Sequence, residues 1–115
     1  MSPLPVRVEP DGPPDAVRVF AALGDRTRFG IVERLRAGGS MSIQRLTEDC
    51  NVSRQAVTKH LQVLARAGLV RHRRRGRERL WRLEPRQLAE ARRCLDRISQ
   101  QWDAGLERLR RYVER

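Results

Sequence analysis

The chain has 115 residues, enough for one domain with a modest core, and 25 basic against 14 acidic residues give it a formal net charge of +11. It has no run of about 18 apolar residues and no positive-then-apolar signal at its N-terminus, so we expect a cytoplasmic protein without a membrane partner. Two cysteines far apart in the sequence do not form a disulfide framework.

The N-terminal segment, residues 1–14, contains five of the six prolines and is predicted to be a disordered or extended tail. The folded domain is expected over residues 15–115. Asp15 is the expected N-cap of a first helix that Gly24 ends. The apolar side of this helix is predicted to contain Ala16, Val19, Phe20 and Leu23.

Two further short helices are predicted before residue 50. Asp25 caps the first of them, Gly38-Gly39 closes it, and its inward positions are predicted to be Phe29, Val32 and Leu35. The next begins at Ser40 or Ser42 and runs to Asp49, with Ile43 and Leu46 inward. Cys50 follows directly and is interpreted as a small core residue.

A tight turn and a capped helix follow at once. Asn51 tolerates the left-handed conformation of a turn, and Ser53 is a typical N-cap for a helix that runs to about Ala67 and stops at Gly68. A short helix, a three-residue turn and a second helix are typical of a helix-turn-helix. The predicted inward residues of the second helix are Val57, Leu61 and Leu64.

The outward face of this helix carries side chains suited to DNA. Arg54 and Gln55 lie in the first turn, where Arg can bond guanine and Gln adenine in bidentate fashion, and Thr58 can meet a thymine methyl group. Ser53 and Lys59 are predicted to contact phosphate, which positions the helix without reading sequence. We therefore predict a recognition helix.

Two strands are predicted after Gly68, over Leu69–Arg74 and Arg77–Leu83, around a Gly-containing turn. Trp81 and Leu83 alternate with Leu80 and Arg82 and can anchor this hairpin. The window Arg71–Arg82 holds seven arginines and one acid, a net charge of +6, which is typical of a surface for a polyanion. The predicted phosphate contacts of this wing are Arg71, Arg73, Arg74, Arg75, Arg77 and Arg79.

Pro85 suits the first turn of a long last helix, predicted over about residues 85–113. Apolar residues step along it by seven, which indicates a seam for a second copy of the chain, although packing on its own domain is the alternative. We therefore predict a homodimer. The predicted seam consists of Leu88, Ala91, Leu95, Ile98, Trp102, Gly105 and Leu109, with Tyr112 continuing it.

The sequence contains no Ser-His-Asp or Cys-His set, phosphate-binding loop or CxxC motif, so we expect neither catalysis nor a cofactor. The predicted fold is mainly α with a small β-hairpin: a three-helix core, a wing and a long dimerisation helix. A DNA-binding regulator is the preferred function. A nonspecific or RNA-binding adaptor that uses the basic wing is the alternative, although the five aromatic residues all fit core or seam positions and not stacking platforms.

The chain resembles the ArsR/SmtB family of bacterial winged-helix repressors. The likeness is carried by residues 20–28 (FAALGDRTR), by residues 52–61 (VSRQAVTKHL) with Leu64 and 67–70, and by the wing. The resemblance implies a homodimer that binds an imperfect inverted repeat in double-stranded operator DNA and blocks transcription.

The chain departs from the metal-sensing members of that family. Their Cys-x-Cys box falls at Ser42 and Gln44 here, and the predicted last helix contains no histidine, so we expect no metal site. The resemblance is therefore to the branch without metal boxes. An unidentified small-molecule or protein inducer, or a thiol switch through Cys50 or Cys94, stays open.

Overall fold

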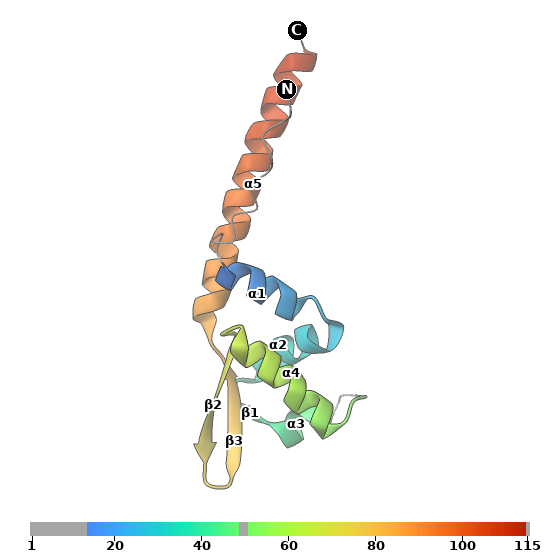
Figure 1. Cartoon of the computed structure of the whole chain (residues 1–115), viewed down its shortest axis with the longest axis vertical. Coiled ribbons are helices and arrows are strands. Elements are labelled where there is room, and N and C mark those ends of the chain that lie inside the picture. The colour runs from blue at the N-terminus through green and yellow to red at the C-terminus, as the bar shows by residue number, and fades with distance from the viewer. Residues whose placement is uncertain (1–13, 49–50, 115) are drawn as a thin grey trace.

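The computed structural model describes residues 14–48 and 51–114, which form helices and a small three-stranded antiparallel sheet (Figure 1). The predicted class, a mainly helical winged helix-turn-helix with a long last helix, is confirmed. The helices are α1 Pro14–Leu23, α2 Arg26–Gly38, α3 Ile43–Glu48, α4 Arg54–Arg66 and α5 Pro85–Val113. The strands are β1 Met41–Ser42, β2 Val70–Arg75 and β3 Glu78–Leu83.

Most helix ends lie where local chemistry predicts them. The carboxylate of Asp25 accepts a hydrogen bond from the backbone N–H of Arg28 at 2.9 Å, and the hydroxyl of Ser53 accepts one from that of Ala56 at 3.1 Å. Both side chains thereby satisfy an N–H that the first helical turn leaves unpaired. Gly39, directly after α2, has φ of 74°, a conformation that disfavours residues with a Cβ.

The start of the first helix differs from the prediction. The first helix begins at Pro14, so Asp15 lies within its first turn and does not precede it as a cap. Proline is well tolerated there because the N–H that it lacks would have no partner in the helix. The rest of the predicted tail, together with Asp49 and Cys50, lies outside the described residues.

Strand β1 was not predicted. Its two residues pair with β3 in antiparallel register, Met41 opposite Trp81 and Ser42 opposite Leu80. A two-residue strand is too short to show alternation in the sequence. It nevertheless makes β3 the central strand of the sheet, in the order β1-β3-β2, and so attaches the hairpin to the helical core.

The core lies where α1, α2, α3 and α4 meet the base of the sheet. The predicted inward residues of α4 are each 0% exposed, and Leu46 and Trp81 are also buried. The prediction for Phe29 was wrong, because this side chain is 52% exposed. With 3.6 residues per turn, the buried face of α2 is centred on Ile31, Val32 and Leu35, and in the first turn that face falls on Arg28.

Helix α5 belongs to the domain only at its beginning. Its first turns pack on α1, where Ala91 is 5% exposed and Leu88 is partly buried. The remainder projects away from the domain, so the long dimension of the chain reaches 67 Å (Figure 1). None of the helices in the described parts is long and apolar enough to cross a membrane.

Candidate DNA interface

Helix α4 presents a polar face whose orientation is set by its buried face. Arg54, Gln55 and Lys59 are exposed, whereas Val57 and Leu61 on the opposite side are fully buried. Because the apolar side chains prevent rotation of the helix, the polar ones are held toward solvent at its N-terminal end. Ser53 is exposed at the N-cap of α4, and its hydroxyl oxygen accepts the hydrogen bond from the backbone N–H of Ala56. The three predicted base-reading residues therefore lie on one helical surface, together with both predicted phosphate contacts of α4.

Thr58 is the least exposed member of this set. Its hydroxyl donates a hydrogen bond of 2.9 Å to the backbone carbonyl of Arg54. The proton of the hydroxyl is therefore used within the helix. The groups of Thr58 that can still contact a DNA base are its methyl group, which suits the methyl group of thymine, and the lone pairs of its hydroxyl oxygen.

The wing is formed by β2 and β3, and its register opposes like charges. Arg74 lies directly opposite Arg79, and Arg71 opposite Arg82. Like charges at directly opposed positions destabilise an isolated hairpin. A polyanion that neutralises them removes this repulsion, so the arrangement favours binding to phosphates. All predicted arginines of the wing are exposed.

Arg71 differs from the other arginines of the wing. Its Nε lies 3.3 Å from the Glu84 carboxylate, at the base of the hairpin where α5 begins. This partner offsets part of its charge. The tip of the wing instead turns at Gly76, which has φ of 63°, and no described residue other than glycine has a positive φ. A positive φ at the first central residue alone is typical of a type II′ turn.

A concave surface of about 400 Å³ joins three elements that are distant in sequence. It is lined by Arg54 of α4, by Arg77, Glu78 and Arg79 of the wing, and by Ser42, Ile43 and Gln44 at the start of α3. Three arginines thus line one hollow beside the N-terminal end of α4. Ser42 was predicted as a possible helix start and, with Gln44, as a position of the absent metal box, but neither residue was assigned to the DNA interface. The helix-turn-helix geometry, in which the first helix crosses the DNA backbone, is the signal that could have placed them here.

A polar cluster links α4 to the connection between α1 and α2. The guanidinium group of Arg28 donates to the carbonyl of Ala22 at 2.6 Å, and its Nη1 lies 3.4 Å from Nδ1 of His60. Asp25 lies 3.9 Å from the same nitrogen. The hydrogen bond from the backbone of Arg28 is the main cause of a lowered pKa of the Asp25 carboxyl. His60 therefore contacts side chains of α2 and its cap, and this cluster supports the orientation of the recognition helix.

Ser42, one position of the family metal box, caps a helix in this chain. The Ser42 hydroxyl accepts a hydrogen bond of 3.2 Å from the backbone N–H of Arg45 and so caps α3. Across residues 14–48 and 51–114, no three His, Cys, Asp or Glu side chains gather in a group that could hold a metal ion. Cys94 is a partly buried free thiol on α5.

Comparison with known proteins agrees with this geometry. A family model described as a helix-turn-helix domain matches residues 23–73. The HTH-type transcriptional regulator Rv2034 of Mycobacterium tuberculosis is 48% identical over 81 residues, which cover 70% of this chain and 75% of that protein. An ArsR-like transcriptional regulator from Rhodococcus sp. RHA1 is 38% identical, with a TM-score of 0.73 over 84% of this chain and 90% of that one.

A more distant structure shares the fold. The winged helix-turn-helix DNA-binding domain Mb0332 from Mycobacterium bovis, a homodimer in solution, has a TM-score of 0.63 at 22% identity, over 87% of this chain and 91% of that one. The fold and the exposed basic surface thus define a winged helix-turn-helix transcriptional regulator. The chain belongs to the ArsR family of these regulators.

Proposed function

We propose that this protein is a homodimeric repressor that binds an imperfect inverted repeat in promoter DNA. The observation that carries the proposal is the polar face of α4, with Arg54 and Gln55 exposed at its N-terminal end, directly beside the arginine-rich wing. The two α4 helices of a dimer would enter successive major grooves about 34 Å apart, while the wings follow the flanking backbone. Base contacts then supply specificity, and the wing supplies affinity that depends on salt.

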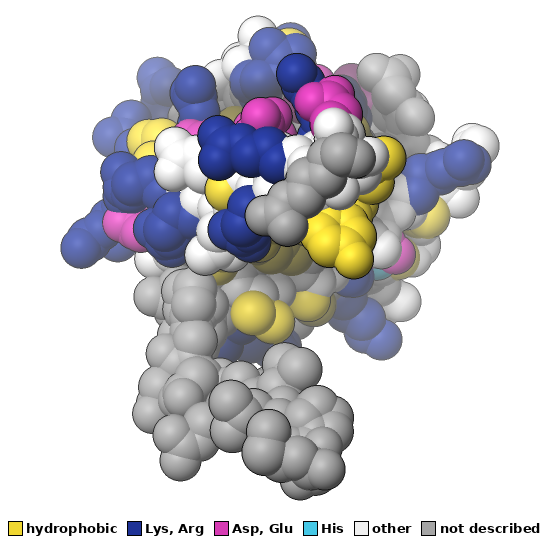
Figure 2. Space-filling view, turned by 90° about the horizontal axis from the view of Figure 1, so that it is seen from above, with side chains coloured by type: hydrophobic (Ala, Val, Ile, Leu, Met, Phe, Trp, Pro, Cys, Tyr) yellow, Lys and Arg dark blue, Asp and Glu magenta, His cyan; other side chains and the backbone are white. Residues whose placement is uncertain are grey.

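The part of α5 that projects away from the domain supports the proposal of a dimer. Trp102 is 67% exposed and Leu109 is 59% exposed, and together with Ile98, Gly105 and Leu106 they border a shallow groove of about 300 Å³. Apolar side chains are visible among charged ones when the molecule is seen from the α5 end (Figure 2). Exposed apolar patches of this kind mark interaction sites. A second α5 that packs into the groove would cover them.

The seam proposed for the dimer is shorter than the heptad pattern predicts. Leu88 and Ala91 pack on α1 of their own chain, so they stabilise the domain and leave little surface for a partner. The available seam begins at Leu95 and includes Leu106, which lies outside the predicted series. Gly105, with no Cβ, would allow two helices to approach closely at the middle of the seam.

Regulation by the known metal boxes is not part of the proposal. Ser42 and Gln44 offer no soft ligands at the box positions, and α5 contains no histidine. The proposed repressor acts by occupying promoter DNA. Release from DNA would need an inducer of another chemical kind.

A binding-site selection followed by footprinting tests the proposed function. We expect the selected sequences to contain a repeat with two half-sites one helical turn apart, and the protein to protect both halves. In transcription from a promoter that contains the repeat, added protein should reduce the amount of transcript. Equal binding to all sequences, or equal affinity for single-stranded RNA, would instead favour a nonspecific adaptor. Activation of the promoter would contradict the repressor role alone.

A further inference from the structure

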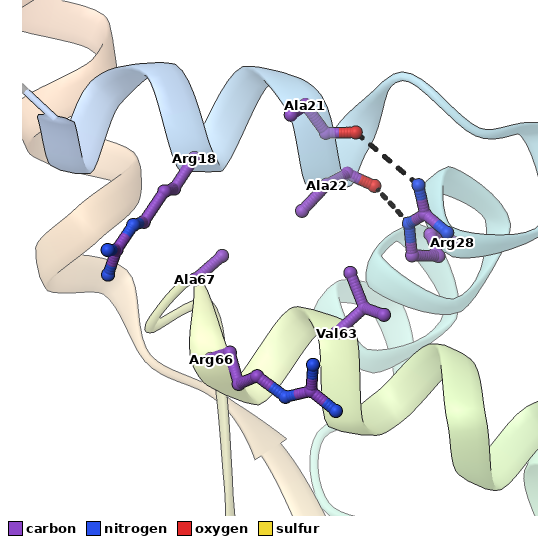
Figure 3. Close-up of a pocket in the computed structure, with 7 residues that line it drawn as sticks. All are labelled: Arg18, Ala21, Ala22, Arg28, Val63, Arg66 and Ala67. Atoms are coloured by element: carbon purple, nitrogen blue, oxygen red, sulfur yellow. Dashed lines mark hydrogen bonds between the residues drawn. The ribbon is translucent and has the colours of Figure 1, made fainter.

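A hollow of about 530 Å³ lies between α1, the first turn of α2 and the C-terminal part of α4 (Figure 3). Its volume lies in the range of small-ligand sites. No residue of the proposed base-reading face, wing or α5 seam contributes to it. The lining residues are Arg18, Ala21, Ala22, Arg28, Val63, Arg66 and Ala67.

The inner part of the hollow is apolar. Its small side chains leave space between α1 and α4. Ala22 is 3% exposed, Ala67 is 8% exposed, and Val63 is partly buried between the two helices. Larger side chains at the two alanines would fill the space between α1 and α4. The floor therefore offers an apolar surface to the body of a ligand.

The rim of the hollow carries three guanidinium groups, and its lining contains no acidic residue. Arg28 is held in place by hydrogen bonds to the carbonyls of Ala21 and Ala22 (Figure 3). Arg18 and Arg66 are exposed, and neither makes a hydrogen bond or an ion pair with another residue among those described. The guanidinium groups of Arg18 and Arg66 beside an apolar floor favour an anion that has an apolar part.

We propose that this hollow binds a small amphipathic carboxylate. Its carboxylate group is held by Arg18 and Arg66, whose planar guanidinium groups match carboxylate geometry, and its hydrocarbon part lies on Ala22, Val63 and Ala67. Figure 3 shows Arg18 extending from α1 and Arg66 from α4, with Ala67 between them and with Ala22 and Val63 nearer to Arg28.

The position of the hollow connects the ligand to DNA binding, and this step rests on the proposed function. Helix α1 packs on the start of α5, and α4 carries the recognition residues at its other end. A ligand held between α1 and α4 stabilises one spacing of these helices over others and adds negative charge beside α4. We expect it to lower the affinity for operator DNA, and the coupling must be reciprocal.

Calorimetric titration with sodium octanoate tests the site without DNA. Octanol, which has the same hydrocarbon chain without the charge, is one control. Inorganic phosphate, which has charge without a hydrocarbon part, is the other. We expect saturable binding of octanoate and weaker binding of both controls. The double variant Arg18→Gln/Arg66→Gln should bind octanoate about tenfold or more weakly, because it cannot form the two charge-assisted hydrogen bonds. The control Arg26→Gln/Arg36→Gln removes the same charge from exposed positions of α2 and should bind as wild type does.

A second variant tests the space itself. Ala21 lines the hollow but is exposed, so Ala21→Leu should obstruct the hollow without disturbing the core. Circular dichroism verifies that each variant is folded. Octanoate binding that is equal in wild type, the double variant and Ala21→Leu would overturn the site, as would octanol binding as tight as octanoate binding.

The effect on DNA is measured separately with the selected repeat. Octanoate should weaken DNA binding of the wild type and leave that of the double variant unchanged. If octanoate binds as expected but DNA affinity does not change, the coupling is refuted while the site stands. If the double variant loses DNA affinity without any ligand, its arginines contribute to DNA binding directly, which refutes coupling through the spacing of the helices while the site stands. Failure of the repressor model leaves the calorimetric result valid.

Discussion

His72 and Trp81 face each other across β2 and β3, with ring centroids 4.7 Å apart and planes inclined by 51°. Trp81 is 3% exposed and its other neighbour in the sheet is Met41 of β1. The aromatic pair therefore joins the charged hairpin to the apolar core. This contact holds the hairpin in a defined position beside α4, although the opposed arginines of β2 and β3 repel one another.

Trp81→Ala should destabilise the fold by about 3–5 kcal/mol, because it removes a buried aromatic side chain and leaves a cavity beneath the sheet. Denaturant unfolding followed by circular dichroism measures the loss. Leu80→Ala on the same strand is the control, since Leu80 is only partly buried and should cost less. A loss from Trp81→Ala no larger than that of the control would show that the tryptophan does not anchor the wing.

Gln55→Ala should relax specificity at one or two base pairs of each half-site, by about 1–3 kcal/mol per position. Gln55 is exposed in the first turn of α4, where base edges are within reach. Competition binding with single-base variants of the selected repeat measures the change. Gln100→Ala on α5 removes an exposed amide far from α4 and should leave the base preferences intact. Unaltered preferences in Gln55→Ala would exclude Gln55 as a base-reading residue.

Arg74→Gln should weaken binding to all DNA sequences alike, because a phosphate contact carries no sequence information. The slope of log affinity against log salt should become less steep by about 1 for each phosphate that the variant no longer neutralises. Arg36→Gln, at an exposed site on α2 that pairs with Glu33, is the control for removal of one charge. Because Arg71 is already paired with Glu84, Arg71→Gln should change the slope less than Arg74→Gln. Identical salt slopes for Arg74→Gln and wild type would remove Arg74 from the interface.

Trp102→Ala should weaken the dimer by about 2 kcal/mol or more, as expected for a large aromatic residue at the centre of an interface. Sedimentation equilibrium measures the dissociation constant. Ser99→Ala, at an exposed position outside the α5 groove, is the control. Fluorescence adds a second measurement: in Trp81→Phe protein, Trp102 is the sole tryptophan, and its emission should shift to the blue as the dimer forms. An unchanged dissociation constant in Trp102→Ala would refute the seam.

Stability should decrease in acid partly through Asp25. The hydrogen bond from the backbone of Arg28 lowers the pKa of this carboxyl in the folded state below its ordinary value of 3.8. Its contribution to stability is therefore fully present above the unfolded pKa and is lost as the pH falls through the lower folded pKa. Thermal melts of Asp25→Asn between about pH 2 and 6 should show a weaker dependence on pH than wild type, since Asn still caps the helix. Asp103→Asn on α5 is the control for removal of an exposed carboxyl. An identical pH profile for Asp25→Asn and wild type would exclude this contribution.

The sequence predicted the elements whose causes are local. Asp25 and Ser53 cap the helices that follow them, Gly39 and Gly76 adopt positive φ, and the apolar periodicity of α4 identifies its buried face. These features depend on hydrogen bonds and side-chain spacing within about one helical turn or one hairpin. The exposed polar face of α4 and the basic wing follow directly from the same pattern.

Tertiary structure decided which faces meet. In the folded chain, Arg28 lies on the inward side of α2 and Phe29 on the outward side. Strand β1 joins the sheet. Leu88 and Ala91 pack within their own domain. The tertiary structure also brought Ser42 and Gln44 beside the arginines of the wing, and opened the hollow between α1 and α4. Each of these depends on packing between segments far apart in the sequence. Periodicity identifies an apolar face, but only the packed helices determine what covers it.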